Sequence, residues 1–105
     1  MTQEFNNLEE IQKYYDEKTN TYVFKENDKY IDLVIFNFDL EIASNIEAFD
    51  INAHDISAFD INARNITYRA VCFAYKNIKC KSIKGRRWNH KHFVLDGVLD
   101  VEEEI

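Results

Sequence analysis

The sequence predicts a mainly β fold, a short parallel β-solenoid, and two observations lead to this prediction. Residues 43–67 form a repeat of five residues, in which Asp or Asn usually precedes Ile and a small residue usually follows two positions after that Ile. A period of five fits neither a helix nor a flat strand, whereas self-similarity at a fixed period indicates a repeat architecture. The 105 residues include no Pro and only two Gly, so no linker divides the chain and a single domain is expected.

Residues 1–40 are expected to cap one end of the solenoid. Asn7 followed by Glu10 has the spacing of a capping box, and apolar residues then recur at helical intervals, which predicts a short helix. Residues 21–24 and 29–36 are rich in β-branched and aromatic side chains and are separated by four polar residues. The two segments are therefore predicted to form a β-hairpin beside the helix.

Residues 41–85 are expected to form the solenoid itself, with two inward columns. The two columns are Ile46, Ile51, Ile56, Ile61, Ile66 and Val71, and Ala48, Ala53, Ala58, Ala63, Tyr68, Phe73, Ile78 and Ile83. Their members lie two residues apart along each strand, so both can point inward, while Asp or Asn turns the chain at each corner. With about five residues per side, a coil holds about fifteen residues if it is triangular and about twenty if it is square, which gives roughly two to three coils.

Residues 86–105 are expected to form a C-terminal hairpin and an acidic tail. Residues 92–95 and 98–101 are apolar segments joined by Asp96-Gly97, a dipeptide that favours a two-residue hairpin turn. The charge of the chain is unevenly distributed, because residues 76–92 contain seven Lys and Arg and no acid, while the net charge of the whole chain is −6. Two surfaces of opposite sign are therefore available to partners.

The pattern Asp/Asn-Ile-x-Ala-x over residues 43 to about 84 resembles the pentapeptide-repeat proteins, with the order of large and small residues reversed. That resemblance implies a square solenoid and favours the four-sided coil. The chain is also similar to small proteins of phages and mobile elements of AT-rich Firmicutes, in segments such as Ala70–Tyr75 and Lys79–Arg87. Small anti-CRISPR inhibitors come from such gene pools. The resemblance implies a phage-encoded inhibitor of a host nucleic-acid-handling protein, such as a Cas9-type CRISPR effector.

The first candidate site is an acidic and aromatic belt on the repeats. Its members are Glu47, Phe49, Asp50, Asp55, Phe59 and Asp60. A rigid array of carboxylates can act as a DNA mimic, because it replaces the phosphates that a basic channel would bind, and exposed aromatic residues are common interface anchors. The alternative interpretation is that the acids only turn the corners and that the N-terminal segment covers the aromatic rings.

The second candidate site is the basic segment. Its members are Lys79, Lys81, Lys84, Arg86, Arg87, Trp88 and Lys91. Cations and an aromatic ring can hold phosphates and a base of a nucleic acid, or the cations can contact an acidic partner. The alternative is a solvated edge balanced by the acidic tail. Because the net charge opposes polyanions, we expect weak or no binding of free oligonucleotides at physiological salt, and contact with nucleic acid only inside a protein complex.

No catalytic or metal site is expected from the sequence. Cys72, Cys80, His90 and His92 lack the spacing of a structural zinc site, and both Cys residues are expected to be small core residues. No nucleophile context or glycine-rich phosphate loop is present, so neither enzymatic activity nor a cofactor is predicted. The start of the chain lacks a secretory signal and no apolar run approaches the about 18 residues of a membrane span. A cytoplasmic location is therefore predicted.

Three functions remain open from the sequence. The leading prediction is a non-enzymatic binding protein that inhibits a host machine by occupying its nucleic-acid site. The first alternative is a direct nucleic-acid binder that uses the basic segment 76–91. The second is a structural module that forms homodimers or polymers through the ends of the solenoid.

Overall fold

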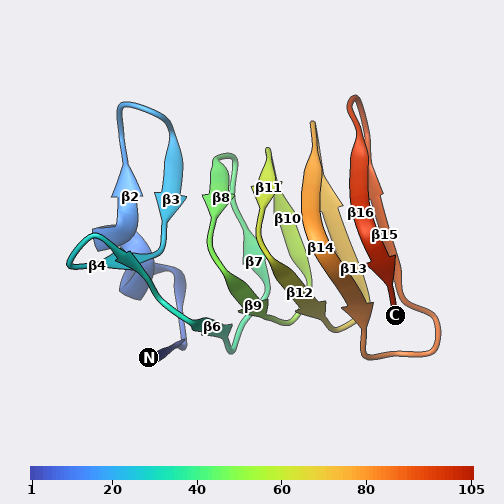
Figure 1. Cartoon of the computed structure of the whole chain (residues 1–105), viewed down its shortest axis with the longest axis horizontal. Coiled ribbons are helices and arrows are strands. Elements are labelled where there is room, and N and C mark those ends of the chain that lie inside the picture. The colour runs from blue at the N-terminus through green and yellow to red at the C-terminus, as the bar shows by residue number, and fades with distance from the viewer.

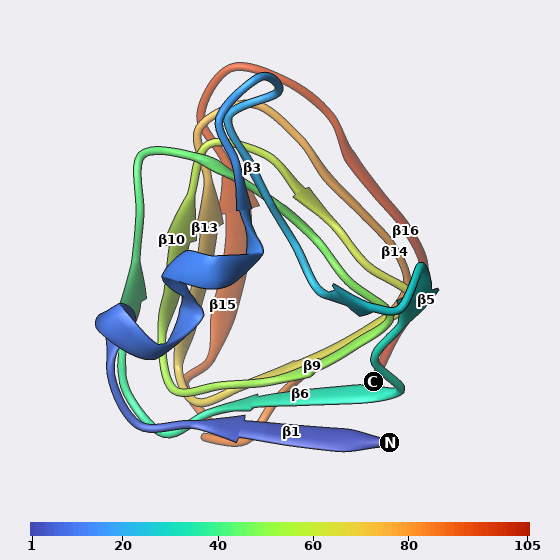
Figure 2. The same cartoon turned by 90° about the vertical axis from the view of Figure 1, so that its left-hand side faces the viewer.

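The protein is a β-solenoid of about four turns, and the computed structural model describes all residues, 1–105. Parallel strands stack along the long axis of the molecule, from the N-terminal to the C-terminal end (Figure 1). Seen along that axis, each coil has three sides (Figure 2). The predicted class, a mainly β solenoid of parallel strands, is confirmed.

Each side of the solenoid is a stack of short strands. The first side contains β3 (Thr21–Val23), β8 (Asn45–Glu47), β11 (Ile61–Asn62) and the starts of β14 (Ile78–Gly85) and β16 (Leu99–Glu104). The second side contains β1 (Thr2–Phe5), β6 (Leu33–Phe36), β9 (Asp50–Asn52), β12 (Asn65–Tyr68) and the ends of β14 and β16. The third side contains β7 (Leu40–Glu41), β10 (Ile56–Ala58), β13 (Val71–Ala74) and β15 (Lys91–Val94). The remaining elements are η1 (Leu8–Tyr14), β2 (Tyr15–Asp16), β4 (Lys25–Glu26) and β5 (Lys29–Tyr30).

The coil is triangular, so the four-sided coil favoured by the resemblance is wrong. Ile46 pairs with Ile61 in the next coil, fifteen positions later, and Asp50 pairs with Asn65 at the same interval. The physical reason is the volume of the interior. Each side contributes one Ile and one Ala, and these side chains are almost completely buried. Three such pairs therefore already fill the space within a coil at the density of a protein interior.

The two predicted inward columns are correct up to Tyr68 and then shift by one residue at Cys72 and by two at Ile78. The Ile column as far as Ile66 and the Ala column as far as Tyr68 are buried. Ile78 and Ile83 are buried too, but they pair with Ile61 and Ile66 and so continue the Ile column, not the Ala column as predicted. Val71 and Phe73 were expected inside, but Cys72 and Ala74 take their places. The corner after Tyr68 has one extra residue, which reverses the inward and outward positions of the following strand.

The N-terminal segment closes one end of the core with a helix. Asn7 caps η1 as expected, because its side chain accepts a hydrogen bond from the backbone amide of Glu10 at 3.2 Å. Ile11 and Tyr14 of this helix are buried, and the helix lies across the end of the coil (Figure 2). No helix in the structure is long and apolar enough to cross a bilayer.

The predicted N-terminal hairpin is much smaller than expected. Within the predicted hairpin, only the two-residue strands β4 and β5 pair in antiparallel fashion; the other antiparallel pair is β2 with β3. The flanking strands β3 and β6 instead pair in parallel with β8 and β9. Residues 21–23 and 33–36 are therefore part of the solenoid wall, since their unpaired edges are completed by the first repeats.

The predicted C-terminal hairpin does not form. β15 pairs in parallel with β13, and β16 pairs in parallel with β14, so residues 91–104 extend the solenoid. Gly97 lies at a corner, where a Cβ atom would be 1.9 Å from the carbonyl oxygen of Lys76. The glycine therefore permits a close approach to the preceding coil. The added strands at both ends explain why the solenoid is longer than the two to three coils expected from the repeats.

Candidate functional site

Asp50 of the predicted acidic belt fastens one coil to the next. Its carboxylate accepts two hydrogen bonds from the Arg64 guanidinium, at 3.0 and 3.1 Å, and one from the side-chain amide of Asn65 at 2.9 Å. Partial burial acts to raise the pKa of Asp50, but these hydrogen bonds outweigh it, so the pKa lies below its usual value. Asp50 is therefore ionised and paired within the solenoid wall.

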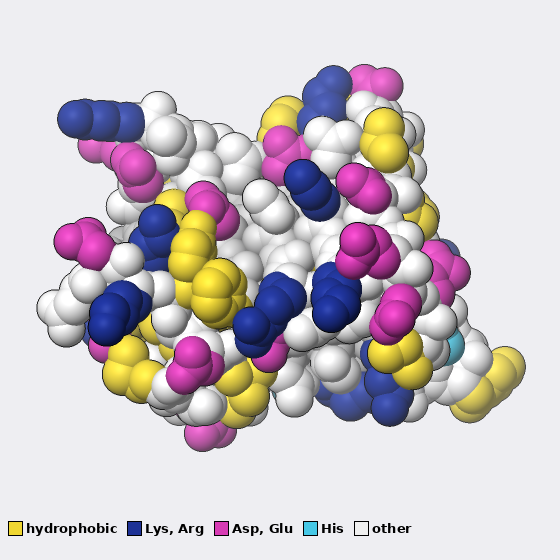
Figure 3. Space-filling model, viewed as in Figure 1, with side chains coloured by type: hydrophobic (Ala, Val, Ile, Leu, Met, Phe, Trp, Pro, Cys, Tyr) yellow, Lys and Arg dark blue, Asp and Glu magenta, His cyan; other side chains and the backbone are white.

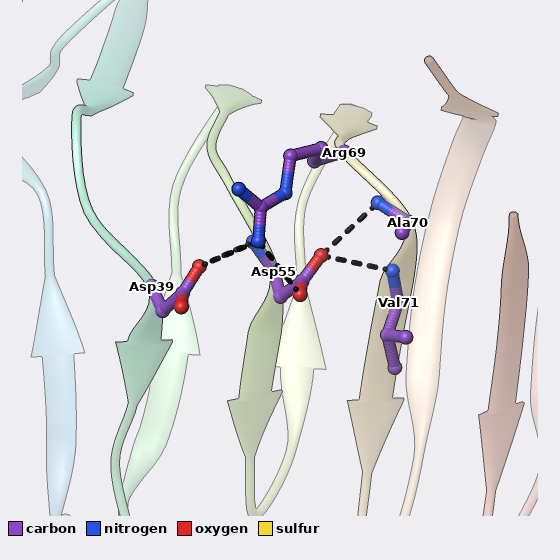
Figure 4. Close-up of polar contacts among 5 residues, drawn as sticks. All are labelled: Asp39, Asp55, Arg69, Ala70 and Val71. Carbon is purple, nitrogen blue, oxygen red and sulfur yellow. Dashed lines mark hydrogen bonds and ion pairs between the residues drawn. The ribbon is translucent and has the colours of Figure 1, made fainter. Parts of the chain in front are cut away.

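Asp55 holds the corner that contains the extra residue. Its Oδ1 atom accepts hydrogen bonds from the backbone amides of Ala70 and Val71, at 3.0 and 3.1 Å. Arg69 lies 3.3 Å from the other oxygen and 3.6 Å from Asp39 of the preceding coil (Figure 4). Burial acts to raise the pKa of Asp55, but the backbone amides and Arg69 lower it further than burial raises it.

The other two acids of the belt also have partners inside the chain. Asp60 accepts hydrogen bonds from the backbone amide of Asn77 at 2.8 Å and from its side chain at 3.3 Å. Glu47 accepts a hydrogen bond from the hydroxyl of Tyr30. The three aspartates lie at three different corners of the triangle, at the starts of β9, β10 and β11, so they do not form one face. The geometry therefore agrees with the alternative interpretation, in which these acids turn the corners.

The two phenylalanines of the belt have different environments. Phe49 stacks on Tyr30 of β5, with ring centroids 4.6 Å apart, and Arg64 lies over its ring. Phe59 stacks on Tyr75 at 5.6 Å and remains partly exposed on the third side. There it borders an apolar hollow of about 260 Å³ that includes Phe73. The N-terminal segment thus covers one ring and leaves the other at the surface.

Two lysines of the predicted basic segment lie beside the acidic tail. Lys79 of β14 is directly opposite Asp100 of β16 in the strand register. Lys81 is on the same strand, between residues that pair with Val101 and Glu103. On this face basic and acidic side chains alternate over the last two coils (Figure 3). Lys79 and Lys81 therefore have acidic neighbours on the adjacent strand, although neither forms an ion pair within 4.0 Å.

Residues 84–91 comprise the end of β14, the connection 86–90 and the first residue of β15, and we call them the basic finger. Its base is fixed to the preceding coil by backbone hydrogen bonds. The amide of Arg86 donates to the carbonyl of Tyr68 at 2.9 Å, and the amide of Arg87 donates to that of Arg69 at 3.0 Å. The amide of Lys91 donates to the carbonyl of Ala70 at 2.8 Å. The finger is therefore held at both ends by the wall.

The charged side chains of the basic finger have no acidic partner. Its exposed cations are Lys84, Arg86, Arg87 and Lys91. None of them has a carboxylate oxygen within 4.0 Å, whereas Arg64, Arg69 and Lys76 elsewhere in the chain are paired. Trp88, at the tip, is 94% exposed, the highest value among the large apolar residues of the protein. This cluster is the strongest candidate for a binding surface.

Cys72 and Cys80 are core residues, as predicted. Both are buried and unpaired as thiols. Burial raises the pKa of the Cys80 thiol to about 11 and raises that of Cys72 further. No group of three or more His, Cys, Asp or Glu side chains is placed to hold a metal ion.

Comparisons with protein-family models, with curated proteins and with solved structures find no match to this chain. The protein is therefore classified by its fold alone, as a small β-solenoid built from a five-residue repeat.

Sequence reasoning selected the cations and Trp88 of the finger but missed the residues that shape it. His90 packs edge-to-face on Tyr68, with ring centroids 6.1 Å apart, and Asn52 accepts a hydrogen bond from Arg86 at 2.6 Å. The available signal was Gly85. A glycine can mark a position where another group approaches the backbone closely, and at Gly85 that group is His90.

Proposed function

We propose that this protein is a non-enzymatic binding protein that holds nucleic acid on its basic finger. The observation that carries the proposal is the combination of four cations without an acidic partner and one almost fully exposed Trp within eight consecutive residues, 84–91. Cations that neutralise phosphates release counterions, and an aromatic ring stacks on bases of any sequence. Backbone hydrogen bonds to the preceding coil fix the base of the finger before the partner arrives, which lowers the entropic cost of binding.

The magnitude of the electrostatic contribution is modest. Four phosphate contacts on a single strand give a slope of about −2.8 in log K against log salt, at about 0.7 per phosphate. The net charge of −6 opposes the approach of a polyanion. Weak binding at physiological salt and stronger binding at low salt are therefore expected.

The DNA-mimic hypothesis is less well supported by the geometry. The carboxylates of Asp50, Asp55 and Asp60 are occupied by hydrogen bonds within the wall, and two of them are paired with Arg. A mimic needs carboxylates that are free to meet a basic channel. Inhibition of a host machine such as a Cas9-type effector, phage origin and a cytoplasmic location stay predictions that rest on the sequence.

Self-association through the solenoid ends also stays a prediction. At the C-terminal end, β15 and β16 each have one unpaired edge. β16 is acidic, with Asp100 and Glu102–Glu104, and charged side chains on an edge strand oppose pairing with another edge. This end therefore favours a monomer at neutral pH.

The proposal is tested by fluorescence anisotropy with labelled single- and double-stranded oligonucleotides at low salt. We expect the double variant Arg86→Gln/Arg87→Gln to bind at least about tenfold more weakly than the parent, since two phosphate contacts are lost. The matched control is Lys18→Gln/Lys29→Gln, which removes the same charge from exposed positions outside the finger. Equal loss in both variants would show that only net charge matters and would contradict the proposal.

A further inference from the structure

The tip of the basic finger is a tight turn that His90 closes. The backbone amide of His90 donates to the carbonyl oxygen of Arg87 at 3.2 Å, and its Nδ1 atom lies 2.6 Å from the same oxygen. A carbonyl can only accept, so Nδ1 must be the protonated ring nitrogen. Trp88 and Asn89 lie between these two residues and are therefore held at the tip.

The ring of His90 is positioned by the two residues that it packs against, Gly85 and Tyr68. A Cβ atom on Gly85 would lie 2.2 Å from the Cβ and Cγ atoms of His90, so only glycine leaves room for this side chain. On its other side the ring meets Tyr68, which is completely buried in the solenoid core. The turn therefore packs against the core, and its conformation does not depend on the flexible Lys and Arg side chains around it.

Tyr68, against which the His90 ring packs, is itself held by a hydrogen bond. The hydroxyl of Tyr68 lies 2.9 Å from Nδ1 of His92, whose Nε2 lies 2.8 Å from a carboxylate oxygen of Glu104. With the proton on Nε2, His92 donates to the carboxylate and accepts from the tyrosine hydroxyl. Tyr68 is thereby fixed at its polar end, and a fixed Tyr68 holds the ring of His90.

We infer that the basic finger takes an unpaired base, stacked on Trp88, and so binds single-stranded nucleic acid in preference to a duplex. This inference rests on the proposed function. In it, His90 and Gly85 are positioning residues that present the indole.

The preference for single strands follows from the exposure of the indole ring of Trp88. Trp88 is 94% exposed, so its ring surface is open to a partner. A base within a duplex is already stacked on both neighbours and must be unstacked at a cost of a few kcal/mol before it can reach the ring. A base of a flexible single strand meets no such cost, and stacking on an aromatic side chain is favourable for every base.

The arrangement of charge fits the same ligand. Arg86, Arg87 and Lys91 lie at the base of the finger, on either side of the aromatic tip in the chain. The backbone of a single strand can follow these cations while one of its bases turns toward the indole. A lipid surface or an acidic peptide would use the cations but would give a different optical response from the indole, which provides the test.

Trp88 is the only Trp in the chain, so emission excited at wavelengths that tyrosine does not absorb reports on the finger alone. The probe is an oligothymidylate of about ten nucleotides, within the site size of single-strand binders. We expect it to quench the emission in a saturable manner at low salt. A duplex of equal length is expected to quench much less at the same concentration.

Variants separate stacking from simple attraction. Trp88→Ala is expected to weaken binding of labelled oligothymidylate by about 5- to 150-fold, the equivalent of one stacked base. Tyr75→Ala, at a partly exposed aromatic residue outside the finger, is the matched control and should bind as the parent does. His90→Ala should weaken binding and lower the polarisation of Trp88 emission in the free protein, because the tip becomes mobile.

The results that would contradict the inference lead to different conclusions about the proposed function. If Trp88→Ala binds the oligonucleotide as tightly as the parent, the stacking inference is wrong while the proposed function stands. Equal quenching by duplex and single strand would overturn the preference for unpaired bases. If no oligonucleotide binds at low salt, the proposed function fails together with the inference. A blue shift of the Trp88 emission with vesicles of phosphatidylserine and phosphatidylcholine, or with polyglutamate, without any response to oligonucleotides, would contradict both the proposed function and the inference. The ligand would then be a lipid surface or an acidic peptide.

Discussion

Asp55 and Arg69 form an ion pair, with 3.3 Å between the carboxylate and guanidinium, at the corner where the five-residue period breaks. The same carboxylate accepts the backbone amides of the two residues that follow Arg69 (Figure 4). One side chain therefore holds the extra residue that moves Cys72 into the core. Without this acceptor, two amides at the corner would lose their partner.

The first prediction concerns this corner. Asp55→Ala is expected to lower the free energy of unfolding by about 1–3 kcal/mol, because partly buried amides are left unsatisfied. Asp39→Ala is the control, since Asp39 is half exposed and its ion pair with Arg69 is longer, 3.6 Å; we expect at most about 1 kcal/mol there. Chemical denaturation followed by circular dichroism measures both. Similar losses in the two variants would contradict the role of Asp55.

The second prediction concerns pH. Asp50 and Asp55 have pKa values below the ordinary value of 3.8 in the folded chain. Groups with a depressed folded pKa stabilise the fold above the unfolded pKa, and this contribution is lost as the pH falls through the folded pKa. Stability should therefore decline as the pH falls below about 4. In Asp50→Asn/Asp55→Asn that decline should be shallower, and an identical pH dependence of unfolding would refute the assignment.

The third prediction tests the inward column on a single strand. Ile61 is 1% exposed, whereas its neighbour Asn62 on β11 points to solvent. Ile61→Asp would bury an unpaired charge and should cost several kcal/mol, on the order of the whole stability of a small domain. Asn62→Asp adds the same charge outside and should change stability by less than about 1 kcal/mol. Thermal melting distinguishes the two, and equal melting temperatures would mean that the column is misassigned.

The fourth prediction concerns the thiols. Burial raises the pKa of Cys80 to about 11, and Cys72 is completely buried. Since the thiolate is the reactive form, neither should react with a thiol reagent in the folded protein at pH 8. Both should react in guanidinium chloride, which serves as the control. Rapid reaction of either thiol in the native state would contradict its position in the core.

The residues inside the repeats could be predicted because the five-residue period identifies the positions that point inward. Ile46 to Ile66 and the alanines between them recur at fixed intervals, and each interval places a large and a small side chain on one strand. The number of sides could not be derived in the same way. Charges avoid one another at both coil lengths, and the choice depends on how three Ile and three Ala fill the interior, which is a property of packing in three dimensions.

The ends of the solenoid were mispredicted because local turn signals also occur at solenoid corners. Asp96-Gly97 has the sequence of a hairpin turn, but Gly97 is needed for its approach to Lys76 of the preceding coil. Pairing partners that are twenty residues away, such as Cys72 and His92, are decided by the stack and not by the dipeptide. Likewise, Gly85 indicates that some group can approach its backbone closely, but the sequence does not show that this group is His90.

The measurement that tests the central claim most directly is the salt dependence of oligothymidylate binding by the parent and by Arg86→Gln/Arg87→Gln. A finger that contacts about four phosphates predicts a slope near −2.8 in log K against log salt, and loss of two contacts reduces it to about −1.4. The control Lys18→Gln/Lys29→Gln should keep the slope of the parent. Absence of binding at low salt, or the same slope in the parent and in the finger variant, would contradict nucleic-acid binding by the basic finger.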